Sequence, residues 1–191
     1  MSAIFESPAV RRHAETISVE LYHRMIDRGV VDPKCELVRG ALVKKMSKSH
    51  LHTSVTAKLQ RRLMAVLPDC WVRLEQPLTF TDSEPEPDIS VVPGSIEDYA
   101  AHPTTARLVI EVAISSEDID REKGTLYAEA GVEEFWLVLP EARAVEIHTG
   151  PRDGTWTNRH RYLASEPFTS TVFPQVALRL DELLGEGKVE C

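Results

Sequence analysis

The stretch from Leu108 to Leu139 constrains the fold more than any other part of the chain. It begins with a continuous apolar run over residues 108–114, which is typical of a strand buried on both faces. One carboxylate, Glu111, interrupts the run, and a buried carboxylate is costly unless a proton, a cation or a metal faces it. A helical pattern, a glycine and a second apolar run follow. The stretch therefore predicts a strand–helix–strand unit in which Glu111 is a candidate functional residue.

The predicted helix carries a lysine on its buried face. Asp118 or Asp120 can cap its start, and Gly131 can end it as the residue after the last turn. Its apolar stripe consists of Ile119, Leu126, Tyr127 and Ala130. Lys123 lies on the same side, because it comes four residues after the first member of the stripe and three or four before the next two. If this helix packs on the strand face that carries Glu111, Lys123 approaches that carboxylate.

The length and composition favour one soluble globular domain over residues 1–191. The chain is 42% hydrophobic and 27% charged, which is ordinary for such a domain. Residues 1–15 are expected to form a loose N-terminal tail. No stretch of about 18 apolar residues predicts a membrane span, and no apolar run near the N-terminus resembles a signal peptide. Three scattered cysteines give neither a disulfide framework nor a metal-ligand spacing, so we expect a cytoplasmic protein.

The net charge of −8 argues against a broad nucleic-acid-binding surface, which is normally basic. Two local basic strips remain. Residues 44–62 contain six lysines and arginines and no acidic residue, and residues 152–161 contain Arg152, Arg159 and Arg161 around Trp156. Each strip is either a solvated face or a local contact for nucleic acid.

The N-terminal half predicts two helices and a hairpin. Ser18 can cap a helix that ends near Arg28, and residues 36–43 read as a hairpin whose first strand begins with Glu36. Residues 47–67 predict a second long helix with His52 at the head of its apolar stripe. His52 is then either a half-buried histidine at a helix end or a histidine that enters the site or contacts phosphate. A zinc pair with His50 is excluded, because the spacing is two rather than four.

The remaining segments predict mainly strands. Residues 71–80 contain Pro77, which indicates a strand that lies near a sheet edge or is broken by a bend. Residues 88–92 form a short apolar run that opens with Asp88. Residues 135–139 and 144–148 predict an antiparallel hairpin, and residues 156–163 predict a further strand. This order predicts an α/β fold with a central mixed sheet, flanking helices and additional hairpins.

Asp88 and Glu111 suggest a chemistry. Two carboxylates brought together in a buried site repel each other unless a cation lies between them. Oxygen ligands suit Mg²⁺ or Mn²⁺, and a nearby lysine can orient water or stabilise charge on a phosphate. These are the parts needed to hydrolyse a phosphodiester. The alternative is that Glu111 and Lys123 form a structural ion pair.

Several short motifs follow one another along residues 18–148. They are Glu36–Gly40, His52, Glu86–Asp88, Leu108–Val112 with Ser115 and Ser116, Asp120–Lys123, Tyr127–Val132 and Glu134–Trp136. Together they resemble the Uma2 family, also called DUF820, which is assigned to the PD-(D/E)XK nuclease superfamily. The resemblance implies the restriction endonuclease-like fold, with Asp88 and Glu111 on adjacent strands.

The resemblance also implies roles for individual residues. Pro87 and Asp88 supply the first half of the superfamily motif and Glu111 begins the second half, but Ala113 stands at the usual lysine position. Lys123 matches a variant in which the lysine has moved to the following helix. The resemblance therefore implies that Asp88 and Glu111 hold Mg²⁺ (or Mn²⁺), while Lys123 positions the attacking water or the scissile phosphate.

Two further residues and the overall function follow from the same resemblance. Glu36 matches an acidic residue that completes the metal site, and His52 matches a family histidine as an accessory residue. We expect a metal-dependent endonuclease that acts on nucleic acid, with DNA as the expected substrate. The alternatives are a nuclease-fold protein that binds nucleic acid or a protein partner without cutting, and a hydrolase of small phosphoesters with a closed pocket.

A homodimer is expected because most soluble oligomers are symmetric dimers. Phe135 and Trp136, interpreted as exposed aromatic side chains, would support such self-association.

Overall fold

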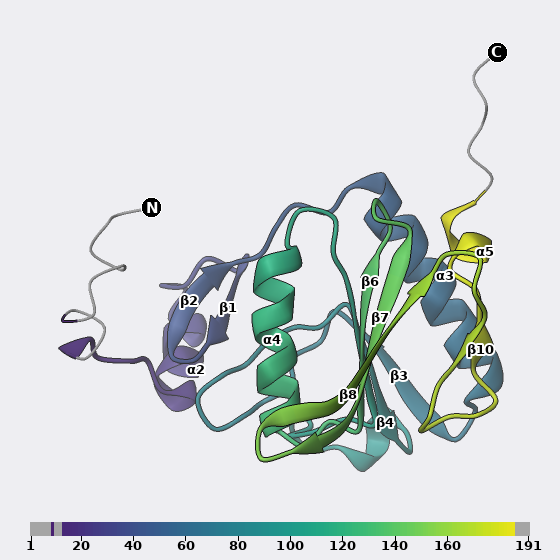
Figure 1. The fold of residues 1–191 in the computed structure, drawn as a ribbon. Coiled ribbons are helices and arrows are strands. Elements are labelled where there is room, and N and C mark those ends of the chain that lie inside the picture. Colours follow the sequence, from purple (N-terminus) through teal and green to yellow (C-terminus); the bar gives the residue numbers. More distant parts are fainter. Residues whose placement is uncertain (1–8, 10–12, 186–191) are drawn as a thin grey trace.

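The computed structural model describes residue 9 and residues 13–185, and a six-stranded mixed sheet forms its centre (Figure 1). The strands lie in the order β3, β4, β5, β6, β7, β8. Their bounds are Cys70–Leu74 for β3, Ile89–Pro93 for β4, Leu108–Val112 for β5, Glu134–Leu139 for β6, Ala144–Arg152 for β7 and Thr155–Leu163 for β8. Strands β5 and β6 pair in parallel, and the other neighbours pair antiparallel. The α/β class and the mixed sheet are confirmed.

Helix α4 (Glu117–Glu129) connects the two parallel strands. A parallel pair needs such a crossover, because a tight turn cannot reverse the chain twice. The helix begins after Ser116, so the expected cap at Asp118 or Asp120 is wrong by two or four residues. It ends before Gly131, whose φ of 71° is a conformation that glycine adopts without strain. The strand–helix–strand unit is therefore present, with β5 two residues shorter than predicted.

The two faces of the sheet are covered by different helices (Figure 1). Helix α3 (His50–Val66) and the short α5 (Asp181–Leu184) cover one face, and their core partners include Ile110, Trp136 and Val138. A two-stranded ribbon of β9 (Phe168–Thr169) and β10 (Ala177–Leu178) closes the same side. Helix α4 covers the other face, where Tyr127 packs with Phe135 and Leu137. Alternate residues of each central strand therefore enter two separate cores.

Helix α2 (Val19–Asp27) and the hairpin of β1 (Cys35–Val38) and β2 (Ala41–Lys44) lie beside α4 (Figure 1). Ser18 caps α2 by accepting a hydrogen bond from the backbone N–H of Leu21 at 3.2 Å. Arg39 and Gly40 turn the hairpin with φ values of 49° and 71°, as a two-residue hairpin turn requires. The expected loose tail over residues 1–15 lies largely outside the described residues.

Two expectations are corrected by the structure. Phe135 and Trp136 are 1% and 0% exposed, because consecutive residues of β6 point to opposite faces and both faces are covered. They therefore offer no surface for self-association. The strand expected over residues 71–80 stops at Leu74, where Glu75 adopts a positive φ of 50°, although β3 does lie at a sheet edge.

None of the helices between residues 13 and 185 is both long enough and apolar enough to cross a bilayer.

Candidate active site

Asp88 and Glu111 meet where β4 begins and β5 ends. The register pairs Ile89 with Ile110, so Asp88 lies beside Glu111. The backbone N–H of Asp88 donates to Glu111 Oε2 at 3.2 Å, and the backbone N–H of Val112 donates to Asp88 Oδ2 at 2.8 Å. Both side chains are buried. The spacing of the two carboxylates is therefore held by the main chain of two neighbouring strands.

The Lys123 ammonium lies among three carboxylates. Its Nζ is 2.9 Å from Glu111 Oε1, 3.1 Å from Asp120 Oδ1 and 3.4 Å from Glu36 Oε1. The side chain is buried on the face of α4 that packs against the sheet. The structure thus brings the helix lysine to the strand carboxylate that interrupts the apolar run.

Glu36 reaches the site from the separate β1–β2 hairpin. Its Oε2 accepts a hydrogen bond from the backbone N–H of Glu86 at 3.0 Å, while its Oε1 faces Lys123. The hairpin is held there because the backbone N–H of Glu84 donates to the carbonyl of Leu37 at 2.7 Å. The segment before Asp88 therefore connects Glu36 to the central sheet.

His52 on α3 and Lys48, just before that helix, also contact Asp88. Ser49 caps α3, which places His52 in the first turn, and His52 Nε2 lies 3.0 Å from Asp88 Oδ2. Lys48 Nζ lies 3.2 Å from Asp88 Oδ1 and 2.7 Å from Glu75 Oε1. His52 Nδ1 is buried and has no hydrogen-bond partner within the described part of the chain. The histidine at the head of the stripe is therefore buried against the site.

Sequence patterns alone missed three members of this arrangement. The Tyr127 hydroxyl donates to Glu111 Oε1 at 2.5 Å, although its position had indicated only the apolar stripe. Asp120, expected as a helix cap, faces Lys123 and accepts a hydrogen bond from Ser116 Oγ at 2.5 Å. Both lie within four residues of Lys123 on one helix side, a spacing that predicts contact. Lys48 had been assigned only to a basic strip.

Apart from Tyr127, these side chains line one cavity of about 230 Å³. Its acidic lining residues are Glu36, Glu75, Glu86, Asp88, Glu111 and Asp120, and its basic ones are Lys44, Lys45, Lys48, His52 and Lys123. Glu36, Asp88, Glu111 and Asp120 are all buried, whereas the basic residues between 44 and 48 are partly or fully exposed. The cavity therefore combines an acidic floor with a rim of mixed charge, where Lys45 pairs with Glu86 and Lys48 with Glu75.

Comparison with protein families gives a match to the Uma2 family, described as "Putative restriction endonuclease", over residues 19–181. The chain belongs to the Uma2 family. A similar solved structure is a protein from Anabaena variabilis ATCC 29413 described as "a putative nuclease belonging to DUF820". The TM-score is 0.72 at 17% identity, over 88% of this chain and 97% of that chain, so the likeness shows a shared fold. No curated protein matches the chain.

The buried charges of this Uma2 protein shift one another's pKa. Burial raises the pKa of Glu111 to about 8; Lys123 opposes this shift, whereas Asp120, Asp88 and Glu36 add to it. Burial acts to lower the pKa of Lys123, but the carboxylates of Glu111, Glu36 and Asp120 outweigh it and raise that pKa well above its usual value. Lys123 is therefore an ammonium at neutral pH.

Asp88 behaves differently from Glu111. Burial acts to raise its pKa, but the hydrogen bond and charge of His52, the backbone N–H of Val112 and the charge of Lys48 lower it overall. Asp88 is therefore a carboxylate at neutral pH, next to a glutamate that holds its proton more tightly.

The carboxylates of this Uma2 protein fit a hard divalent cation by their chemistry. Four buried carboxyl groups, those of Glu36, Asp88, Glu111 and Asp120, lie close together. Burial raises the pKa of Glu111, to which Asp120, Asp88 and Glu36 add, and a bound cation would relieve this repulsion. The donors are oxygens, the ligands that Mg²⁺ and Mn²⁺ prefer. Between residues 13 and 185, however, no three His, Cys, Asp or Glu side chains already stand in an arrangement that would hold a metal.

Proposed function

We propose that this Uma2 protein is a metal-dependent endonuclease that hydrolyses phosphodiester bonds in nucleic acid, with DNA as the substrate. One observation carries the proposal: Asp88, Glu111 and Glu36 come from three separate segments and converge with Lys123 in one cavity. The description of the family, "Putative restriction endonuclease", supports it. Membership of the family supports a nuclease-like function, and the oxygen ligands of the cavity are the basis for proposing a divalent metal.

Asp88 and Glu111 would hold Mg²⁺ or Mn²⁺, with Glu36 as a direct or water-bridged ligand. When bound, such an ion activates water and neutralises charge that develops on the phosphate. The protein contributes rigid positions for these ligands, because backbone N–H groups of Asp88 and Val112 hold the two strand carboxylates. Tyr127 adds a hydrogen bond to Glu111 from α4.

Lys123 would act as a cation and not as a base. Its raised pKa keeps it protonated, so it can donate hydrogen bonds to the attacking water or to a phosphate oxygen. Asp120 and Glu111 hold its ammonium in place. Lys48 lies at the cavity rim with its side chain 35% exposed. There it can contact an incoming phosphate in place of Asp88, whose carboxylate would then be free to bind the metal.

A second candidate is a nuclease-fold protein that binds nucleic acid or a protein partner without cutting. The observation that favours it is the ion pairing of Lys123 with three carboxylates, since such a network also occurs as a purely structural feature. The net charge of −8 points the same way, because an enzyme that cuts nucleic acid without sequence preference usually needs a positively charged groove. A third candidate, hydrolysis of small phosphoesters, uses the same residues in a cavity of about 230 Å³.

A substrate panel separates the three candidates. The purified protein is incubated with supercoiled plasmid, single-stranded DNA, RNA and a chromogenic small phosphodiester, each in Mg²⁺, Mn²⁺ or EDTA. Nicking of nucleic acid that requires metal is the expected result. Hydrolysis of the small ester alone would favour the third candidate. Binding of nucleic acid without cleavage in any metal would favour the second.

A further inference from the structure

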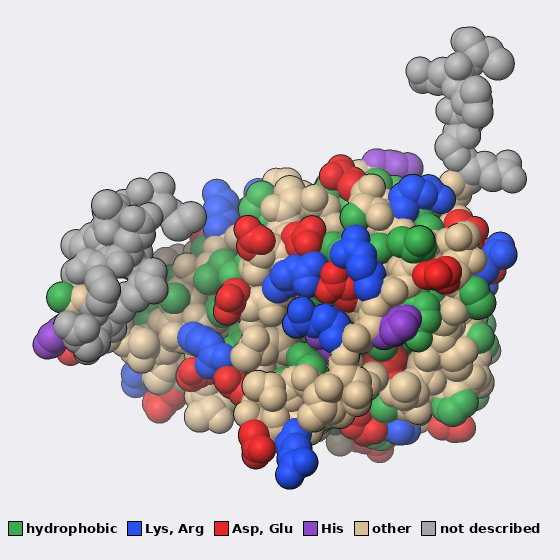
Figure 2. All heavy atoms as spheres, in the orientation of Figure 1, with side chains coloured by type: hydrophobic (Ala, Val, Ile, Leu, Met, Phe, Trp, Pro, Cys, Tyr) green, Lys and Arg blue, Asp and Glu red, His purple; other side chains and the backbone are tan. Residues whose placement is uncertain are grey.

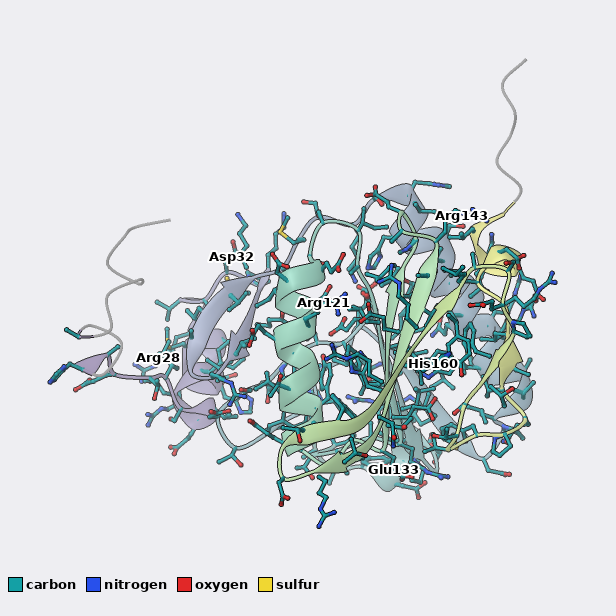
Figure 3. All side chains as sticks on the ribbon, viewed as in Figure 1. Arg28, Asp32, Arg121, Glu133, Arg143 and His160 are labelled. Carbon is teal, nitrogen blue, oxygen red and sulfur yellow. The ribbon has the colours of Figure 1, made fainter. Side chains whose placement is uncertain are left out.

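A second group of arginines lies outside the cavity, on the face of the sheet that α4 covers. Arg121 extends from α4 toward β7 and β8 (Figure 3). Its guanidinium contacts Glu146 of β7 at 2.6 and 2.9 Å, and Arg161 of β8 contacts the same carboxylate at 2.8 Å. Figure 2 shows Lys and Arg side chains gathered with acidic ones over α4 and β8. We call Arg121, Arg159 and Arg161 the arginine cluster.

The cluster has more positive than negative charge. Two carboxylates, Glu146 and Glu117, pair with it. Arg159 is exposed and has no ion pair within the described part of the chain. His148 is buried beside Glu146, and its pKa is lowered to about 4, first by burial and next by the charge of Arg159. It is therefore neutral, so three guanidinium groups face two carboxylates.

Strand β8 itself consists almost entirely of hydrogen-bond donors. Every side chain from Thr155 to Tyr162 can donate a hydrogen bond, and none is acidic. Most of the strand is exposed, and it forms the free edge of the sheet. Trp156 has already used its indole N–H on the carbonyl of Gly124 at 2.8 Å. Because side chains of a strand alternate between faces, Arg159 and Arg161 share the α4 side, whereas Tyr162 packs with Phe168 on the other side. The exposed donors on the α4 side suit a ligand whose accessible groups are acceptors with negative charge.

The geometry of α4 connects this strand with the cavity. Asp120 and Lys123 face the cavity, whereas Arg121 faces β7 and β8 on another side of the same helix turn. An α-helix with side chains is about 10–12 Å wide, and phosphates along one strand of a duplex advance by about 3.4 Å per step. A backbone lying on the cluster therefore reaches the cavity mouth within roughly three to four nucleotides.

The charge of β8 argues against a second copy of the chain as the occupant of this edge. Antiparallel pairing of β8 with itself would bring Arg159 and Arg161 close to their counterparts, and facing like charges are destabilising. Charged side chains on an edge strand are a usual protection against such pairing. Arginine forks match phosphate oxygens well.

We propose that the arginine cluster and the exposed donors of β8 bind the sugar-phosphate backbone of the nucleic acid that the cavity cleaves. This inference rests on the proposed function, because it assigns that site a macromolecular substrate. It makes Arg159 the most informative residue, since that guanidinium has no carboxylate partner in the described structure to release before it binds.

Fluorescence anisotropy with a labelled DNA duplex tests the inference in EDTA, where no cleavage occurs. Arg159→Ala is expected to weaken binding by about 3- to 10-fold and to reduce the slope of log affinity against log salt by about 1. Arg159→Lys is expected to retain most of the affinity. The matched control is Arg61→Ala, which removes an exposed arginine from α3 on the other face of the sheet.

Several outcomes would overturn the inference. They are no binding of duplex by the wild type, equal affinity and salt slope for Arg159→Ala, or an equal loss in Arg61→Ala, which would indicate net charge only. Duplex binding indifferent to Arg159 would fit an acidic protein partner on β8 instead. Cleavage is measured separately: binding that depends on Arg159 without metal-dependent cleavage would support the surface and contradict the proposed catalysis.

Discussion

Lys123 Nζ lies 2.9 Å from Glu111 Oε1, although the lysine belongs to α4 and the glutamate to β5. The pair explains how a chain with Ala113 at the usual lysine position of the motif still places an ammonium at the strand carboxylates. Ala113 is itself buried against the α4 side of the sheet. Helix α4 therefore supplies the ammonium group that the strand segment around Ala113 lacks.

Removal of Asp88 should abolish binding of a divalent cation. In Asp88→Ala, the Mn²⁺ affinity measured by calorimetry is expected to fall by more than about tenfold, since even supporting residues of metal sites cost that much. Glu97→Ala, which removes an exposed carboxylate outside the cavity, should bind Mn²⁺ like the wild type. Unchanged affinity in Asp88→Ala would exclude Asp88 from the metal site.

Loss of the Tyr127 hydroxyl should destabilise the fold. Tyr127→Phe leaves a buried oxygen of Glu111 without one of its donors, and the free energy of unfolding is expected to fall by about 1–3 kcal/mol. Urea titration measures this change. Tyr162→Phe is the control, because its hydroxyl makes no hydrogen bond within the described chain. Equal midpoints for both variants would contradict a supporting role for Tyr127.

Gly124 should resist replacement although it lies inside a helix. A Cβ atom there would lie 2.8 Å from Phe135 Cε1, so α4 would have to move away from the sheet. Gly→Ala usually stabilises a helix by about 1 kcal/mol, but here we expect a loss of about 1–3 kcal/mol from overpacking. The measurement is the thermal unfolding midpoint of Gly124→Ala, with Glu122→Ala at an exposed position on α4 as the control. A stabilised Gly124→Ala protein would contradict this packing.

His148 should make stability fall in mild acid. Its folded-state pKa is lowered from 6.5 to about 4, chiefly by burial, so the unfolded chain binds the proton more tightly and stability rises with pH between these values. The contribution is complete above about pH 6.5, and roughly 2 kcal/mol of it is lost by pH 5. The raised pKa of Glu111 acts in the opposite direction over the same pH range, so the loss is measured as the difference between wild type and His148→Gln in the change of urea midpoint from pH 7 to pH 5. His148→Gln should lose less, and an equal loss would assign the effect to other groups.

The strand–helix–strand unit could be predicted because its signals are local. The apolar run of β5, the stripe of α4 and Gly131 all lie within one short segment, and the same periodicity placed Lys123 toward Glu111. The order of strands and helices then predicted the mixed sheet.

Contacts between distant segments could not be predicted in the same way. The His52–Asp88 contact joins α3 to the start of β4, and neither local pattern specifies the other. The basic strip over residues 44–62 looked continuous, but Lys48 contacts Asp88 while Lys58 donates to the carbonyl of Leu183 at 2.7 Å. The burial of Trp136 depends on Phe168 and α3, which cover a face that the sequence of β6 does not reveal.

The nicking rate of supercoiled plasmid by wild type and Lys123→Ala, in Mg²⁺ and in EDTA, is the decisive measurement for metal-dependent cleavage at Asp88, Glu111 and Lys123. Asp88→Asn is measured in parallel, since Lys123→Ala leaves three buried carboxylates without their shared cation and its fold must be checked by circular dichroism. We expect the wild type to nick plasmid in Mg²⁺ but not in EDTA, and both variants to lose at least about a hundredfold in rate. Metal-dependent nicking that persists in both folded variants would contradict this expectation.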